Sequence, residues 1–184
     1  MTNFNQHLLY FASFLKNPNQ INYQTLSHRD KILNVSSYYL MLSVFCGLIL
    51  WYVVEVAEKF GVFNELKPTF ESSSIILRIL SAVVLAPLVE ETVFRLSLGY
   101  YRSSVYFKWI FYFSAITFGQ IHIINYQIDT THYLFIPFIT LSQTFTGLLF
   151  GFVRVVYGFG YAILLHSLHN VCCLTWYYVF GFDL

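Results

Sequence analysis

The chain has 184 residues, of which 57% are hydrophobic and only 10% charged, and its formal net charge is +1. So little charge cannot cover the surface of a soluble domain of this length, and a near-neutral chain gives no indication of nucleic-acid binding. Composition therefore predicts a membrane protein, with the lipid bilayer as its first partner and no nucleic-acid partner.

The N-terminal segment, residues 1–31, differs from the rest because it is rich in Asn and Gln. Apolar side chains recur there at the spacing of one helical face, at Phe4, Leu8, Phe11 and Leu15. This pattern predicts a short helix lying in the membrane interface. No basic region precedes it and no small-residue cleavage site follows it, so a signal peptide is not indicated. We predict a cytoplasmic, interfacial segment over 1–31 and a transmembrane domain over 32–184.

Five long apolar stretches follow. Four of them contain no Lys, Arg, Asp or Glu, namely 32–54, 109–128, 130–153 and 155–182. The remaining stretch, 72–89, is the second in chain order and is interrupted only by Arg78. About 20 apolar residues are enough to cross a bilayer as a helix. We therefore predict an all-α fold, a polytopic membrane helical bundle of about five core transmembrane helices preceded by the interfacial helix.

The positions of Lys and Arg predict the orientation of the bundle. Basic residues gather before the first stretch and around the connection between the second and third, at Lys16, Arg29, Lys31, Arg102 and Lys108. The 125–132 loop contains no Lys or Arg. This alternation places the N-terminus on the cytoplasmic side.

Ionisable side chains follow directly after the 72–89 stretch, at Glu90, Glu91 and Arg95. A charge at the centre of a membrane span costs about 2.5–3.5 kcal/mol on insertion scales, so it persists where it is paired or faces a wet cavity. Glu91 and Arg95 are four residues apart, which predicts an ion pair on one helix face. Glu90 is then a spare carboxylate. Pro87 lacks an N–H and leaves the carbonyl of Val83 open, which predicts an irregular, hydrated helix.

Two other stretches place an imidazole and a carboxamide three or four residues apart, as His122 with Asn125 and His166 with Asn170. Counting the rise along each helix places Glu90 and His122 at similar depth and His166 nearer the membrane surface. Each group alone is more often a structural hydrogen-bonding residue than a catalyst. Their coincidence on three stretches favours a functional site.

A carboxylate beside an imidazole can take a proton from water, and a second imidazole with an amide can bind a developing oxyanion. These groups suit amide hydrolysis without a covalent nucleophile. Two alternatives stay open. Carboxylate and imidazole also bind zinc, in which case Glu90, His122 and His166 are the candidate ligands. The groups could also be structural clamps of a non-catalytic membrane scaffold or immunity protein.

The ordered set Glu90-Glu91-x-x-x-Arg95, Phe118-x-x-x-His122 and His166-x-x-x-Asn170 resembles the CPBP family. This family comprises the CAAX proteases and bacteriocin-processing enzymes and is also called the ABI family. The resemblance covers about residues 74–180. Leu96 departs from it, because many members have Gly at that position.

By this resemblance the chain is similar to glutamate-dependent intramembrane endopeptidases of the type II CAAX prenyl protease kind. The resemblance implies that Glu90 and His122 activate water, that His166 and Asn170 stabilise the oxyanion, and that Glu91 and Arg95 support the site. It implies no cofactor. The substrate would be a membrane-associated protein or peptide, cleaved in peptide maturation or self-immunity, and the location would be the bacterial cytoplasmic membrane, crossed several times.

Overall fold

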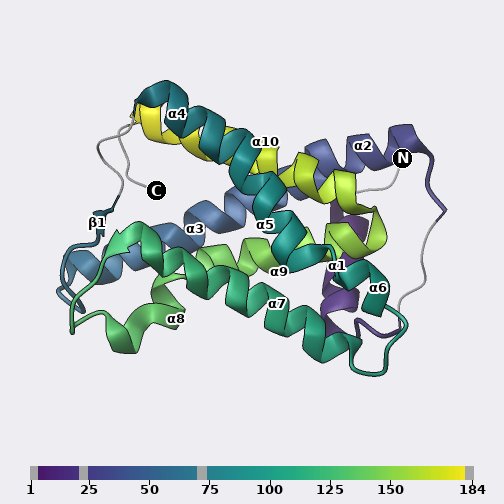
Figure 1. Ribbon diagram of the computed structural model, residues 1–184, viewed down its shortest axis with the longest axis horizontal. Helices are drawn as coiled ribbons and strands as arrows, with labels where there is room; N and C mark the ends of the chain where they lie inside the picture. Colours follow the sequence, from purple (N-terminus) through teal and green to yellow (C-terminus); the bar gives the residue numbers. More distant parts are fainter. Residues whose placement is uncertain (1–3, 21–24, 70–73, 181–184) are drawn as a thin grey trace.

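The computed structural model describes residues 4–20, 25–69 and 74–180. Within these ranges the chain is almost entirely helical, and the strands are β1 (Lys67–Pro68) and β2 (Tyr126–Gln127), which pair antiparallel. The predicted all-α class is confirmed. Figure 1 shows the long helices side by side along the longest axis of the molecule.

The first long segment runs without a break from His28 to Lys59. It comprises α2 (His28–Asn34), the π-helical turn η1 (Val35–Tyr39) and α3 (Leu40–Lys59). Ser27 caps its start, because the Ser27 side-chain oxygen accepts a hydrogen bond of 3.2 Å from the Asp30 N–H. The helix therefore begins four residues before the boundary predicted at 32, since the polar residues before the apolar run supply its cap and first turn.

The remaining segments follow in chain order, after the N-terminal helix α1 (Phe4–Lys16). The second long segment comprises α4 (Ile75–Leu80), the π-helical turn η2 (Ser81–Leu85) and α5 (Ala86–Arg95). After it come α6 (Leu98–Tyr101), α7 (Phe107–Ile121) with the 3-10 turn η3 (His122–Asn125), the 3-10 turn η4 (Tyr133–Phe135), α8 (Ile136–Ile139), α9 (Leu141–Val156) and α10 (Phe159–Phe180).

The connections gather at two opposite ends of the molecule (Figure 1). One end holds α2, α6 and the junction between α9 and α10. The other end holds the end of α3, the short β-ladder and α8. Successive long segments therefore run in alternating directions, as expected for helices joined by short connections.

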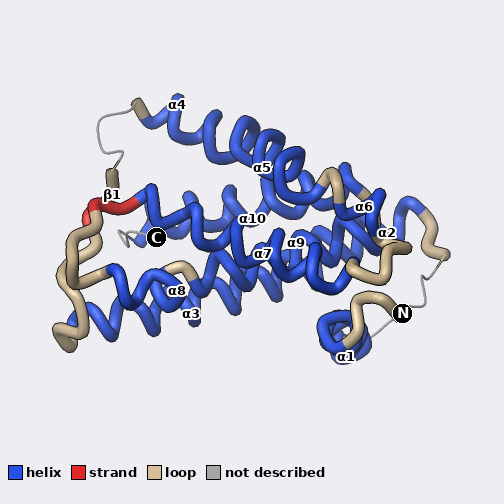
Figure 2. Tube along the Cα trace, turned by 60° about the horizontal axis from the view of Figure 1, so that its bottom comes forward, coloured by secondary structure: helices blue, strands red, loops and turns tan. Residues whose placement is uncertain are grey.

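Helix α1 lies across the long helices and is seen nearly end-on in Figure 2. The helix predicted there is present, but its apolar stripe is divided. Phe11 is buried in the bundle, whereas Leu8 is 40% exposed. The inner face is completed by His7 and Phe14, which are also buried. The Phe14 ring packs edge to face against Phe152 at 5.2 Å, which anchors α1 to α9.

Small residues bring α7 and α9 together at the centre of the bundle. A Cβ atom added to Gly119 would lie 2.7 Å from the Thr144 Cα, and one added to Gly147 would lie 2.9 Å from the Phe118 ring. Only glycine at these positions permits this approach without displacement of the neighbouring atoms. The close crossing sets the position of Phe118, which faces the polar cluster described below.

Length and composition identify one helix that could cross a membrane, His28–Lys59, among the residues that the structure describes. The bent pair Tyr133–Ile139 and Leu141–Val156, which meet at 43°, could form a second span. The five predicted spans therefore remain a prediction, although helical segments occupy most of all five apolar stretches.

Candidate active site

The π-helical turn η2 directly precedes α5, which carries Glu90, Glu91 and Arg95 of the polar cluster. The N–H of Ala86 bonds to a carbonyl five residues back rather than four, and Pro87 has no N–H to offer. The carbonyl of Ala82 is therefore left without a helix partner, and the Asn170 side chain donates a hydrogen bond of 2.7 Å to it. The irregularity predicted at Pro87 is present, but the carbonyl that another helix covers is one residue before the predicted Val83.

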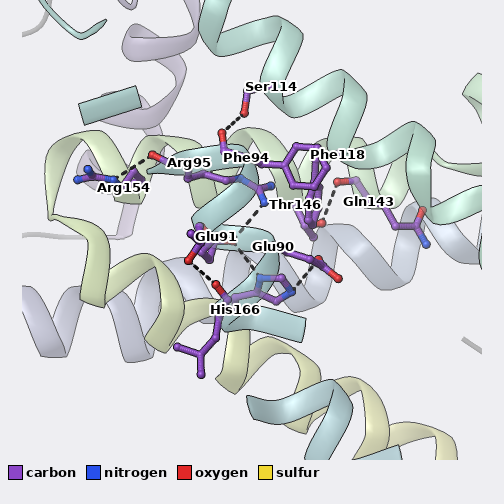
Figure 3. A network of polar contacts seen from close by, with 12 residues as sticks. Glu90, Glu91, Phe94, Arg95, Ser114, Phe118, Gln143, Thr146, Arg154 and His166 are labelled. Carbon is purple, nitrogen blue, oxygen red and sulfur yellow. Dashed lines mark hydrogen bonds and ion pairs between the residues drawn. The ribbon is translucent and has the colours of Figure 1, made fainter. Parts of the chain in front are cut away.

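The predicted ion pair between Glu91 and Arg95 lies at the centre of this cluster (Figure 3). The Arg95 Nη1 atom is 3.2 Å from the Glu91 Oε1 atom, and both side chains are fully buried. The same carboxylate oxygen is 2.9 Å from the Nδ1 atom of His166 on α10. Glu91 therefore links α5 to α10, and Arg95 neutralises its charge in the interior.

The guanidinium of Arg95 also lies over an aromatic ring. Its Cζ atom is 3.6 Å from the centre of the Phe118 ring on α7. Its three nitrogens make no hydrogen bond within the described part of the chain, so the Glu91 carboxylate and this cation–π contact stabilise the buried charge. The motif Phe118-x-x-x-His122 singled out Phe118 but gave no indication of this contact with Arg95.

Glu90 points to the other side of the cluster, where two imidazoles face it. Its Oε2 atom is 3.8 Å from the Nε2 atom of His122 and 3.7 Å from the Nε2 atom of His166. These distances are longer than a direct hydrogen bond. The Glu90 side chain is 25% exposed, so it is more accessible than Glu91. Both histidines reach the same oxygen, which corrects the prediction that His166 lies at a different depth.

The backbone and Glu91 determine which nitrogen of each imidazole faces Glu90. The Nδ1 atom of His122 is 2.7 Å from the Phe118 carbonyl oxygen, which only accepts, so Nδ1 carries the hydrogen. The Nδ1 atom of His166 donates in the same way to the Glu91 carboxylate. Each Nε2 atom is therefore held toward Glu90, as in sites where an outer partner fixes the tautomer.

Two polar residues near the motifs lie outside this cluster. Asn125 ends the 3-10 turn η3 and is exposed, so it does not face the interior beside His122 as their spacing suggested. His169 is on a different side of α10, where its Nδ1 atom is 3.1 Å from the Ser43 Oγ atom of α3. The turn after His122 and the rotation between residues 166 and 169 separate these groups from Glu90.

The C-terminal end of α5 is held by side chains that sequence reasoning did not select. Arg154 on α9 donates from Nε to the Arg95 carbonyl and from Nη2 to the Leu96 carbonyl, both at 3.1 Å. Ser114 donates to the Phe94 carbonyl at 2.5 Å. A cation at a helix C-terminus is favourable. The only sequence signal was a lone arginine ending an apolar stretch.

Leu96, which departs from the glycine common in the CPBP family, follows directly after α5. Its backbone is right-handed helical, with φ −56° and ψ −44°. Any residue type adopts this conformation. The substitution therefore leaves the end of α5 unstrained.

The donors around Glu90 are of the kind that zinc accepts. However, within residues 4–20, 25–69 and 74–180 no group of three or more His, Cys, Asp or Glu side chains is arranged to hold a metal ion. The zinc alternative, with Glu90, His122 and His166 as ligands, therefore has suitable atoms but no formed ligand cluster.

Comparison with known proteins supports the reading of these motifs. A family model described as type II CAAX prenyl endopeptidase Rce1-like matches residues 72–172. No curated protein and no solved structure matches the chain. The matched region covers more than half of the 184 residues and spans α5, α7, α9 and most of the polar face of α10. The match confirms the CPBP resemblance, and the chain belongs to the type II CAAX prenyl endopeptidase Rce1-like family.

Proposed function

We propose that this chain is an endopeptidase that hydrolyses a peptide bond of a membrane-associated protein or peptide with water activated by Glu90. One observation carries the proposal. The Glu90 Oε2 atom faces the Nε2 atoms of two histidines from two other helices at 3.8 and 3.7 Å, and it makes no hydrogen bond to the described protein. The Glu90 side chain is a quarter exposed, and its buried Oε2 atom has no hydrogen-bond donor from the described protein, which leaves it able to accept a proton as a general base.

In the proposed reaction, Glu90 accepts a proton from water while the water oxygen attacks the carbonyl carbon of the scissile amide. The His122 Nε2 atom accepts the second hydrogen bond of that water and orients it. The proton held by Glu90 then passes to the amide nitrogen as the C–N bond breaks, which leaves a carboxylic acid and an amine. Proton transfer of this kind contributes about 10²–10⁴-fold to hydrolysis rates.

His166 and Asn170 are the proposed oxyanion donors. A protonated His166 would donate from Nε2, and the buried Glu91 carboxylate on its Nδ1 atom at 2.9 Å would stabilise the imidazolium. Asn170 uses one N–H for the Ala82 carbonyl, so its second N–H is the one assigned to the oxyanion. Both residues project from α10, one helical turn apart.

We also propose that the bundle crosses the bacterial cytoplasmic membrane five times with its N-terminus in the cytoplasm. Large apolar side chains on the outer helix faces support this, since Phe45 of α3 is 63% exposed, Ile76 of α4 is 73% exposed and Phe113 of α7 is 72% exposed. Such surface suits lipid better than water. The alternating segments also bring the predicted cytoplasmic residues Lys31 and Arg102 to one end of the molecule (Figure 1).

The deciding experiment is single-turnover cleavage of a membrane peptide by the purified protein in liposomes, with and without a strong zinc chelator. The wild type should keep its activity in chelator, and Glu90→Gln should lose it in both conditions. Glu65→Gln, which removes an exposed carboxylate in the connection between α3 and β1, is the matched control and should stay active.

Each other outcome assigns a different function. Activity lost in chelator and restored by zinc would support the metal-dependent alternative. Activity retained by Glu90→Gln would overturn the glutamate mechanism. Substrates are best identified by comparing the membrane peptides of wild-type and Glu90→Ala cells, because no loop in the chain indicates a recognition domain.

A further inference from the structure

A second polar site lies away from Glu90, at the end of the bundle where α2, α6 and the α9–α10 junction meet. A pocket of about 440 Å³ opens there, within the size range of small-molecule sites. Three of its lining side chains are cationic, Lys31, Arg102 and Arg154, and none is acidic. We propose that this pocket binds a phosphate group.

Tertiary structure alone assembles this charge. Lys31 is on α2, Arg102 follows α6 and Arg154 is on α9, so the three residues are far apart in sequence. Like charges that share a pocket repel one another, and a bound anion relieves the repulsion. At the opposite end of the molecule Lys59 and Lys67 lie beside carboxylates, with the Lys59 Nζ atom 2.6 Å from Glu55 and the Lys67 Nζ atom 3.8 Å from Glu65, so these two lysines can serve as a control pair.

The Arg154 side chain is fixed in the pocket by hydrogen bonds, as expected for a residue that binds phosphate. Two of its five N–H groups donate to the Arg95 and Leu96 carbonyls, which leaves three for other acceptors. Gly99 makes room for the guanidinium, because a Cβ atom at that position would lie 2.3 Å from Arg154 Nη2. A fixed, planar guanidinium is suited to binding phosphate oxygens in pairs.

The start of α10 adds to the positive potential of the pocket. Gly158 lines the pocket and has a φ of 119°, a left-handed conformation that favours glycine. This turn lets the 22-residue helix α10 begin at Phe159, beside the pocket. The first N–H groups of a helix carry partial positive charge and bind phosphate readily. The helix end reinforces a site that the three cationic side chains define.

Two sources could supply the phosphate, the headgroup of an acidic phospholipid or free inorganic phosphate. The chemistry at Arg154 and Lys31 is the same for both, and the test separates them. The protein in detergent is titrated, by calorimetry, with inorganic phosphate, with short-chain phosphatidylglycerol and with short-chain diacylglycerol, which has no phosphate. Saturable binding of inorganic phosphate supports the free anion as ligand, and binding of phosphatidylglycerol without inorganic phosphate supports the headgroup.

The Lys31→Gln/Arg102→Gln protein should bind the ligand about tenfold more weakly or worse, because two cations are removed. The matched control is Lys59→Gln/Lys67→Gln, which changes net charge equally at the other end and should bind as the wild type. Gly99→Ala should also weaken binding with the charge unchanged, because it displaces the Arg154 guanidinium. Absence of binding by the wild type to both phosphate ligands, binding of diacylglycerol equal to that of phosphatidylglycerol, or equal loss in both double variants would overturn the proposal.

Discussion

Glu90 and Glu91 are adjacent on α5, yet they belong to two different regions of the molecule. Glu91 is fully buried and contacts both Arg95 and His166. The Glu90 side chain is a quarter exposed, and its Oε2 atom makes no hydrogen bond within the described residues. Successive residues of a helix differ by about 100° in direction. One turn of α5 therefore holds both Glu91, whose charge is neutralised by Arg95 in the interior, and Glu90, whose side chain is partly exposed. The comparison teaches that adjacent carboxylates on one helix can have different environments, because Glu91 contacts Arg95 and α10 whereas Glu90 faces the imidazoles of His122 and His166.

The largest effects are expected when Glu90 and Glu91 are replaced one at a time. Glu90→Gln should lower single-turnover cleavage by on the order of 10⁴-fold, because the amide cannot accept a proton. Its thermal unfolding midpoint should stay close to that of the wild type. Glu91→Gln, by contrast, should lower the thermal unfolding midpoint, since Arg95 would be buried without its counter-charge. Equal midpoints for the two variants would contradict the division into two regions.

Arg95→Ala should give the next largest effect, on stability. Removing one member of a buried ion pair typically costs about 3–5 kcal/mol, because the remaining charge is buried alone. Equilibrium unfolding in detergent measures the loss. The control is Glu91→Leu/Arg95→Met, which removes both charges and should unfold at a free energy closer to the wild type. A wild-type unfolding curve for Arg95→Ala would show that the pair has no structural role.

Asn170→Ala should reduce single-turnover cleavage by about 10²–10³-fold, the usual loss for one oxyanion donor. Asn125→Ala, which removes an exposed amide, is the control and should remain active. Combining Asn170→Ala with Glu90→Gln should cost little beyond Glu90→Gln alone, because residues that act as a unit are not additive. Fully additive losses would place Asn170 outside the catalytic group.

A third carboxylate, Asp129, should give the smallest effect. It is in the loop before η4, where hydrogen bonds from the Thr131 hydroxyl, the Asn64 amide and the Thr131 N–H hold its pKa well below the usual range. A depressed folded-state pKa stabilises the protein above the ordinary pKa of Asp, and this contribution is lost as the pH falls through the folded value. Asp129→Asn should therefore flatten the acid limb of the stability profile and leave cleavage near neutral pH unchanged.

Much of this molecule could be predicted from the sequence because the signals are local. Uncharged runs predicted the helices, and the spacing of Glu91 and Arg95 predicted their ion pair. The order of the Glu, His and Asn motifs predicted the family. The π-helical turn η2 was only partly predicted, since Pro87 indicates an irregular helix but does not specify which carbonyl is left open or which residue covers it.

The all-α class, the polar residues of the candidate site and their order along the chain follow from the sequence alone, because helix periodicity and motif spacing depend on neighbours in sequence. The folded chain was needed to show that His166 reaches both Glu90 and Glu91, that Phe118 lies under Arg95, and that His169 and Asn125 stay outside the cluster. These contacts join residues from different helices. They depend on how closely α7 and α9 cross and on how far η2 rotates α5, and neither quantity is encoded in the spacing of residues along one helix.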